Sequence, residues 1–348
     1  MSIRKLTCGL ACAVAVAALA GSLSGVAVAA DMPTVKLMVG GIDKQIYLPY
    51  QLAQSLGMYQ KYGVDVELST EQAGGVGAED ALISGQVDMA GAWYNHTIQF
   101  QEKGKNVIGV IQLSVAPGER IMCAKGADVK SPTDWKGKSV GVTDLGSGTD
   151  DLVSYVSARA GLQPTDYTKI AAGAGQTMIA ALKFGKAVCG ITSQPTVNAI
   201  QKLGVGYSAI DLSTGAGVQK WLGGEFPAAS VLANADWVDS HKDATQRVVN
   251  ALVATLAWMK THTAADVAAV MPADFVSNPL TSKDEYISAL QKDWGQFNLD
   301  GVGIMPENGP QTVNDIEKAA GKIKGTADLS KTFTNDFVIA AQKQEGIK

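Results

Sequence analysis

Ala73-Gly74-Gly75 followed by Ala81-Leu82-Ile83-Ser84-Gly85 has a counterpart 100 residues later, in Ala172-Gly173-Ala174-Gly175 followed by Ala181-Leu182-Lys183-Phe184-Gly185. In both blocks a glycine-rich turn precedes a short predicted helix, and an apolar strand follows. Glycine turns recur by chance in α/β proteins, but the agreement of order and spacing favours a duplicated βαβαβ unit. Two such units predict two similar lobes, and the cleft between α/β lobes commonly holds a small molecule.

Each unit also has a matching strand and helix upstream. In the first unit, strand Val35–Gly40 precedes a helix that begins near Pro49 and ends at Gly57. In the second, strand Ser139–Val142 precedes a helix that ends at Gly161. Proline suits the first helical position because the N–H that it lacks would be unpaired there, and glycine commonly ends a helix. We further expect Asn95 to cap a helix, strands at 107–113, 120–124 and 230–234, helices at 150–159, 176–184 and 195–202, and a helical C-terminal part.

The first 29 residues are typical of a secretory signal peptide. Arg4 and Lys5 precede the apolar run Leu10–Leu19, and Ala27-Val28-Ala29 is a small-x-small cleavage site. A transmembrane anchor is the alternative, but the glycines, the serines and the cleavage site favour removal. We therefore predict export to the periplasm.

The length of the chain indicates more than one core. A chain of 348 residues is long for a single hydrophobic core and fits two lobes. The turn Ala116-Pro117-Gly118 marks the expected first crossing between them. The predicted division is the signal peptide at 1–29, the first part of lobe I at 30–117, lobe II at 118–214, and a return to lobe I with C-terminal helices at 215–348.

Charge and motif content exclude several classes of function. The net charge is −4 and no basic run is present, which disfavours nucleic acid or anionic lipid as a partner. The histidines His96, His241 and His262 have no metal-ligand spacing, and no nucleophile elbow, P-loop or dinucleotide fingerprint occurs. We predict no catalytic residue, metal or cofactor.

Two cysteines remain in the chain after removal of the predicted signal peptide. Cys123 and Cys189 each lie in an apolar predicted strand. Export would permit a disulfide bond, but buried free thiols are the simpler expectation.

Three ordered stretches carry a family resemblance. They are Gly57–Glu67 (GMYQKYGVDVE), Ala81–Asp88 (ALISGQVD), and Trp135–Val142 (WKGKSVGV) followed by Gly146-Ser147-Gly148-Thr149. In this order they resemble the periplasmic substrate-binding proteins of nitrate, alkanesulfonate, taurine and thiamine-precursor importers, the NMT1/THI5-like superfamily. The second repeat has Val188 where the motif has aspartate, so it carries the resemblance less well.

The resemblance implies an α/β, type II-like binding-protein fold with a mixed sheet in each lobe. It also implies that the chain delivers a small molecule to the membrane permease of an ABC importer, and we expect it to act as a monomer. The same superfamily includes a pyrimidine synthase, but the cysteine-rich run of that enzyme is absent here. A secreted enzyme and the ligand-binding partner of a sensor system remain alternatives.

Ligands of open α/β sheets bind beyond the carboxyl ends of the strands, and this rule selects the candidate residues. In lobe I, Trp93 and Tyr94 are placed to stack on a flat or apolar ligand, although a packing cluster is the alternative. The candidates are Tyr47, Gly75, Trp93, Tyr94 and Asn95 in lobe I, and Ser147, Gly148, Thr149, Gln176, Thr177 and Gln194 in lobe II.

An anionic ligand is expected from the turn Ser147-Gly148-Thr149, whose backbone N–H groups and hydroxyls precede a helix. The alternative is an ordinary helix cap beside Asp150 and Asp151. Arg120 can bind a carboxylate or sulfonate in a bidentate manner, or pair at the surface instead. We therefore predict capture of a small organic anion, a sulfonate or a carboxylate, with no covalent chemistry.

Overall fold

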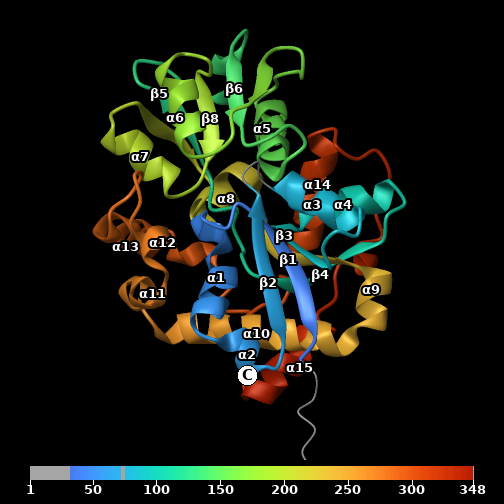
Figure 1. Ribbon diagram of the computed structural model, residues 1–348. Coiled ribbons are helices and arrows are strands. Elements are labelled where there is room, and N and C mark those ends of the chain that lie inside the picture. Colours follow the sequence, from blue (N-terminus) through green and yellow to red (C-terminus); the bar gives the residue numbers. More distant parts are fainter. Residues whose placement is uncertain (1–31, 72–74, 348) are drawn as a thin grey trace, which may run out of the picture. The chain divides into compact units, whose positions relative to one another are not determined.

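The computed structural model describes residues 32–71 and 75–347. The predicted signal peptide at 1–29 and part of the first glycine turn lie outside the described residues. Residues from Met32 onward form one compact unit built around two five-stranded sheets (Figure 1). We call the first sheet with its helices lobe I, and the second sheet with its helices lobe II.

The sheet of lobe I has the order β2-β1-β3-β10-β4. Strand β1 pairs in parallel with β2 and β3, whereas β10 pairs antiparallel to β3 and β4. β10 is thus the strand that returns to lobe I after the chain has built lobe II. The strands are β1 (Thr34–Gly40), β2 (Asp65–Glu71), β3 (Met89–Trp93), β4 (Val107–Gln112) and β10 (Ala229–Asn234).

The sheet of lobe II repeats this arrangement in the order β7-β6-β8-β5-β9. Strand β6 is parallel to β7 and β8, and β5 is antiparallel to β8 and β9. The matching orders confirm two similar α/β lobes, as the duplicated pattern predicted, and each lobe has the mixed sheet that the resemblance implied. The strands are β5 (Arg120–Ala124), β6 (Ser139–Val142), β7 (Thr168–Ala171), β8 (Cys189–Thr192) and β9 (Gly206–Asp211).

Two stretches of chain connect the lobes. The predicted crossing at Ala116-Pro117-Gly118 lies between β4 of one sheet and β5 of the other, and the return lies between β9 and β10. The limits 30–117, 118–214 and 215–348 stay predictions. The helices on the two sheets are α1 (Leu48–Ser55), α2 (Met58–Lys61), α3 (Gly75–Ile83), α4 (Asn95–Glu102), α5 (Gly148–Arg159), α6 (Gln176–Lys183), α7 (Thr196–Lys202) and α8 (Gly215–Leu222).

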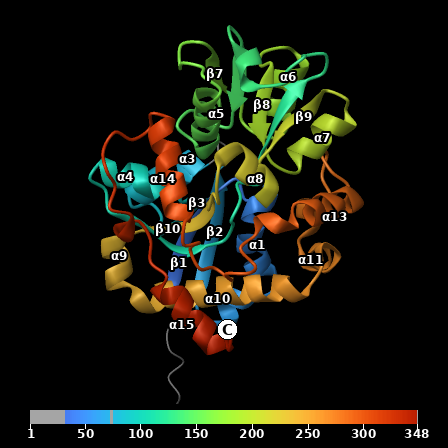
Figure 2. The same ribbon diagram turned by 180° about the vertical axis from the view of Figure 1, so that it is seen from behind.

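The C-terminal part is helical, as predicted. Helix α10 packs against α1, α2 and α15, and α14 packs against both α4 and α5, so α14 contacts both lobes (Figure 2). None of the described helices is both long and apolar enough to span a bilayer. The helices are α9 (Ala235–Ser240), α10 (Lys242–Thr261), α11 (Ala264–Val270), α12 (Ala273–Val276), α13 (Lys283–Lys292), α14 (Gly309–Ala319) and α15 (Asp336–Glu345).

Asn95 does not cap α4. Tyr94 occupies the cap position and makes no side-chain cap bond. The Asn95 amide instead donates to Asp151 at 2.8 Å and to Glu317 at 3.2 Å. Two buried carboxylates outside the helix therefore override the local capping preference on which the prediction rested.

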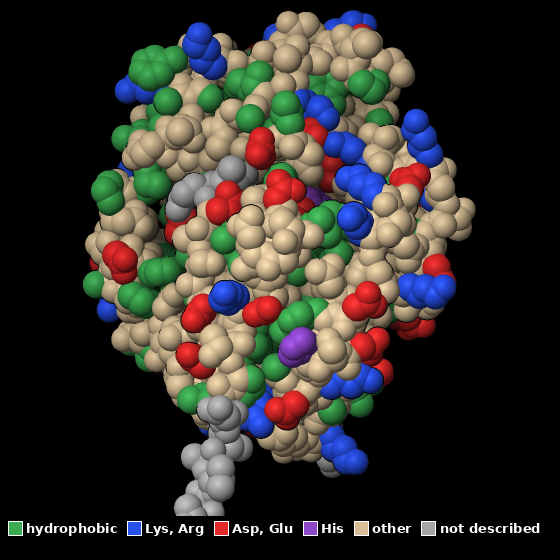
Figure 3. Space-filling model, turned by 45° about the vertical axis from the view of Figure 1, so that its right-hand side comes forward, with side chains coloured by type: hydrophobic (Ala, Val, Ile, Leu, Met, Phe, Trp, Pro, Cys, Tyr) green, Lys and Arg blue, Asp and Glu red, His purple; other side chains and the backbone are tan. Residues whose placement is uncertain are grey.

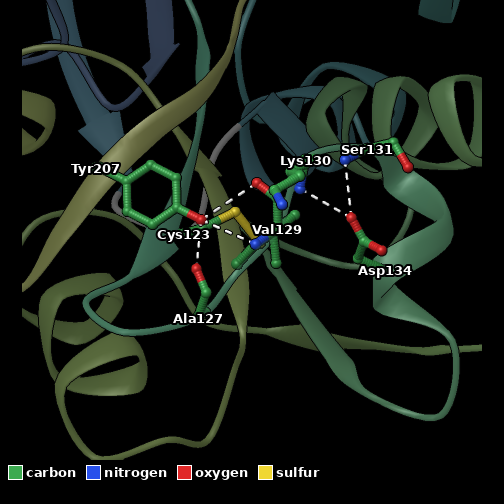
Figure 4. The surroundings of a disulfide bond; sticks show 8 residues. Cys123, Ala127, Val129, Lys130, Ser131, Asp134 and Tyr207 are labelled. Carbon is green, nitrogen blue, oxygen red and sulfur yellow. Dashed lines mark hydrogen bonds between the residues drawn. A yellow bond between two sulfur atoms is a disulfide. The ribbon is translucent and has the colours of Figure 1, made fainter.

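The expectation of free thiols is wrong, because Cys123 and Cys189 form a disulfide bond with an S–S distance of 2.01 Å (Figure 4). The two residues are directly opposite each other on the antiparallel strands β5 and β8. Directly opposed residues bring their Cβ atoms close together, which the sequence alone does not reveal. The bond joins two central strands of lobe II.

Candidate functional site

A cavity lies where the strand ends of the two lobes face each other. Its volume is about 20 Å³, enough for about one water molecule. The cleft is therefore nearly closed in this structure. Six of the candidates predicted from the sequence line it, namely Tyr47, Gly75, Trp93, Ser147, Gly148 and Thr149. Six lining residues were not predicted, namely Lys44, Ile46, Glu79, His96, Glu119 and Thr143.

The two adjacent aromatic candidates point to different places. Trp93 lines the cavity and is 6% exposed. Tyr94 is fully buried; its hydroxyl shares a 2.5 Å hydrogen bond with Thr332, and its ring packs edge-on against Phe333. Tyr94 therefore belongs to the packing cluster that was the alternative, and Trp93 alone remains placed to contact a ligand.

Arg120 is directed away from the cavity. Its guanidinium binds Asp293 through two bonds of 2.8 and 2.6 Å and Asp211 through one of 3.0 Å. The preceding residue, Glu119, lines the cavity instead. Successive side chains of extended chain point to opposite sides, so the crossing brings the acid and not the base to the cleft.

The remaining lobe II candidates lie outside the cavity lining. Gln176 and Thr177 are exposed at the start of α6. Gln194 is buried, and its amide bonds to Asn198 on the next turn of chain. These three side chains are not brought together with Ser147, Gly148 and Thr149.

The turn before α5 uses its own hydroxyls. Those of Thr143, Ser147 and Thr149 bond to one another at 2.7 to 3.1 Å. The Oγ of Ser147 also accepts from the N–H of Asp150, so Ser147 is the cap of α5. The hydroxyls are thus engaged within lobe II, whereas helix geometry leaves the N–H groups of Gly148 and Thr149 without acceptors in the helix.

Asp150 and Asp151 do not line the cavity. Asp150 is paired with Lys169 and Lys322, and Asp151 with Lys322 at 2.7 Å. Asp151 also accepts from Asn95 at 2.8 Å and from Gln99 at 2.7 Å, both on α4 of lobe I. These bonds join α5 of lobe II to lobe I and the chain after α14, and so hold the cleft closed.

Lys44 and Glu119 bring opposite charges to the cavity wall. The ammonium of Lys44 donates to the carbonyl of Gly40 at 3.1 Å, and burial lowers the pKa of Lys44. Burial raises the pKa of Glu119 to about 7, although Lys44 and Arg120 oppose the shift. Oε2 of Glu119 has no hydrogen-bond partner among the described residues.

Glu79 and His96 form a second charged pair on the wall. Oε2 of Glu79 is in a short hydrogen bond with Nδ1 of His96. Burial lowers the pKa of His96, but Glu79 and Asp151 outweigh it and the net pKa rises to about 9. Burial raises the pKa of Glu79. Oε1 of Glu79 and Nε2 of His96 have no hydrogen-bond partner among the described residues.

The described part of the chain holds no cluster of three or more His, Cys, Asp or Glu side chains that could bind a metal ion. On the face seen in Figure 3, acidic and basic side chains lie close together along the boundary between the lobes. The lining residues together present hydrogen-bond donors, acceptors and an aromatic ring to the cavity. A wall of this kind is a binding surface for a small polar ligand.

The sequence contains only weak indications that these unpredicted residues line the cavity. Lys44 and Ile46 lie in the loop after the first strand, which the strand-end rule already placed at the cleft. Glu79 lies one turn into α3, where an acid ordinarily faces water, and it is 4% exposed. His96 is next to a predicted candidate, yet nothing local indicated that Glu79 would pair with it.

Comparison with known proteins gives the chain its relatives. A family model described as NMT1/THI5 like matches residues 46–265. A solved protein from Bordetella bronchiseptica RB50 is 27% identical, with a TM-score of 0.82 over 90% of this chain and 98% of that one. No curated protein sequence matches.

Two further solved structures share the fold at lower identity. The periplasmic nitrate-binding protein NrtA from Synechocystis PCC 6803 is 18% identical, with a TM-score of 0.69 over 89% of this chain and 88% of that one. The alkanesulfonate-binding protein SsuA from Xanthomonas axonopodis pv. citri, bound to MOPS, is 15% identical, with a TM-score of 0.67 over 86% and 98%. These likenesses confirm the predicted periplasmic-binding-protein fold.

Proposed function

The chain belongs to the NMT1/THI5-like family, and we propose that it is the periplasmic solute-binding component of an ABC importer. It captures a small organic acid, a sulfonate or a carboxylate, between its lobes and presents the closed form to the membrane permease. It acts as a monomer and makes or breaks no covalent bond in the ligand.

The observation that carries the proposal is a buried cavity whose wall comes from both lobes. Trp93 and Lys44 contribute from lobe I, and Gly148 and Thr149 from lobe II. A ligand in contact with both walls favours the closed arrangement by its differential affinity for it. That is the behaviour required of a protein that signals occupancy to a partner.

The acidic group of the ligand has two candidate contacts. The N–H groups of Gly148 and Thr149 begin the twelve-residue helix α5, where the helix dipole favours negative charge. Lys44 supplies a buried ammonium with one described hydrogen bond. An anion that pairs with this ammonium would offset the burial that lowers the pKa of Lys44.

A thermal-shift screen of small sulfonates and carboxylates tests the proposal. A ligand at a hundred times its Kd raises the free energy of unfolding by about 2.7 kcal/mol. The bound compound is then recovered after long incubation and identified by mass spectrometry. Recovery of intact ligand supports a binding protein, whereas a converted product would favour the secreted-enzyme alternative.

A further inference from the structure

A buried junction of polar side chains joins the lobes beside the cavity. Asp151 on α5 of lobe II and Glu317 on α14 are both fully buried. Asn95 and Gln99 on α4 of lobe I each donate one amide hydrogen to each of these carboxylates, at 2.7 to 3.2 Å. The two carboxylates thus share one pair of neutral donors, and opening of the cleft would separate those donors from Asp151.

The cations of the junction lie beside Asp151 and not beside Glu317. Lys322 pairs with Asp150 and Asp151, and Nε2 of His96 lies 3.9 Å from Asp151. No ion pair joins Glu317 to a described residue, and its two oxygens accept hydrogen bonds from the neutral amides. Burial of a carboxylate without a cation strongly disfavours its ionised form.

The charges that face Glu317 come from several elements. Helices α4 and α5 pack directly against α14, and α3, β7 and the chain after α14 bring further charged groups to the junction. With His96 protonated, the described acids outnumber the described bases by one, so one negative charge of the closed junction has no base to balance it. These groups are the acids Glu79, Asp150, Asp151 and Glu317 and the bases His96, Lys169 and Lys322.

A proton on Glu317 would balance that charge. Burial raises the pKa of Glu317 to about 8, and the charge of Asp151 adds to the shift, although the amides and His96 oppose it. The O–H of a protonated Glu317 needs an acceptor. Oδ1 of Asn95 is buried at the junction without a hydrogen-bond partner among the described residues, and the nitrogen of the same amide lies 3.2 Å from Oε1 of Glu317.

We propose that closure of the cleft takes up one proton at Glu317, so that a lower pH favours the closed form that holds the ligand. This inference rests on the proposed function, because binding of the ligand is what closes the cleft. When α5 leaves α4, water reaches the junction and Glu317 returns toward the ordinary pKa of 4.5. The proton therefore stabilises the closed form fully below pH 4.5, and this stabilisation is lost as the pH rises to about 8.

The Kd values of ethanesulfonate, propionate and benzoate at pH 6 and pH 8 test the inference, because all three probes stay largely ionised over this range. Calorimetry is carried out on the unsubstituted protein and on two variants. Glu317→Gln keeps the shape of the protonated acid and cannot ionise, whereas Asp315→Asn removes an exposed acid from the same helix. Glu119 and the other groups of the cavity wall are present in all three proteins, so the ratio of the Kd at pH 8 to the Kd at pH 6 is compared between proteins.

For each probe that binds, this ratio should be about 10- to 100-fold larger in the unsubstituted protein and in Asp315→Asn than in Glu317→Gln. Equal ratios in the unsubstituted protein and Glu317→Gln would overturn the inference and leave the proposed function standing. If Glu317→Gln does not fold, infrared difference spectra of the unsubstituted protein decide the question. Binding of an ionised probe at pH 6 should add the band of a protonated carboxyl group, and the absence of that band would overturn the inference. If none of the three probes binds at either pH, the proposed capture of a small acid fails and the inference fails with it.

Discussion

Trp93 and Gly148 touch across the cleft: a Cβ added at Gly148 would lie 2.1 Å from Cε3 of the Trp93 indole. Trp93 is the last residue of β3 in lobe I, and Gly148 is the first residue of α5 in lobe II. The closed arrangement therefore depends on the absence of a side chain at residue 148. This contact makes the glycine a test of closure.

Gly148→Ala should oppose closure. The added methyl group cannot fit unless the indole of Trp93 or the backbone shifts, and overpacking of this kind costs about 1–3 kcal/mol. We expect the free energy of ligand binding to weaken by that amount, while each lobe of the variant keeps its secondary structure. Calorimetry with a confirmed ligand measures the change, and Gly146→Ala is unsuitable as a control because Gly146 has a positive φ of 86°.

A better control for that experiment is Gly215→Ala. Gly215 begins α8, and an added Cβ would meet no atom within 4 Å. Its affinity should match that of the unsubstituted protein. If Gly148→Ala also binds with unchanged affinity, the Trp93 contact is not part of the closed state.

The neighbours Trp93 and Tyr94 should give opposite results when each is replaced by alanine. Trp93→Ala removes a cavity wall and should weaken binding by about 1–3 kcal/mol in a protein that remains folded. Tyr94→Ala removes a buried ring and its bond to Thr332, and should lower the free energy of unfolding by about 3–5 kcal/mol. Urea denaturation and calorimetry on both variants separate the two roles; a similar loss of stability in both would place Trp93 in the core.

Lys322 should hold the lobes together. It pairs with Asp150 at 2.6 Å and Asp151 at 2.7 Å, and both acids lie on α5 of lobe II. Lys322→Met leaves buried carboxylates with fewer partners, a change that typically costs about 3–5 kcal/mol. Opening the cleft hydrates the acids and so relieves that cost. The free energy of ligand binding should therefore weaken by more than the free energy of unfolding of the open form falls. Lys324→Met, at an exposed lysine, is the control; equal ligand affinity in the two variants would contradict the role of Lys322.

Ionisation of Glu119 should make the free energy of unfolding depend on pH. Burial raises the pKa of this carboxyl from 4.5 to about 7, so the folded protein holds the proton more tightly than the unfolded chain does. The resulting stabilisation is complete below pH 4.5 and is lost as the pH rises through 7. Glu119→Gln has no proton to lose.

The ligand-free Glu119→Gln variant should therefore gain stability relative to the unsubstituted protein between pH 5 and pH 8. The pKa shift corresponds to a gain of about 3 kcal/mol. Burial also raises the pKa of Glu317, to about 8, so Glu317 titrates in the same range in both proteins and the difference between them is the informative quantity. A difference that stays constant from pH 5 to pH 8 would show that Glu119 does not titrate in this range.

The sequence predicted the two lobes because the repeat records their topology directly. Glycine turns, apolar strands and helix ends are local features, and each sheet followed from them. The strand-end rule likewise placed Tyr47, Trp93 and the turn at Gly148 on the cleft. What it did not supply was the direction of each side chain.

The errors at the site have that common cause. Arg120 and Tyr94 were expected at the ligand, but Arg120 is drawn to Asp293, 173 residues away, and Tyr94 to Thr332, 238 residues away. Glu79 on α3 and His96 on α4 are brought together because both helices pack on the sheet of lobe I. The pairing of Cys123 with Cys189 likewise depends on the register of β5 and β8. Contacts of this kind follow from tertiary packing and have no local pattern.

Small-angle scattering with and without a confirmed ligand tests most directly the central claim, that the lobes close over a ligand held between them. The account predicts that the radius of gyration falls when the ligand binds, because the lobes then close over it. The ligand-free protein should have a larger radius of gyration, because no ligand then favours the contact between the two walls. A radius of gyration that does not change when the ligand binds would contradict the account.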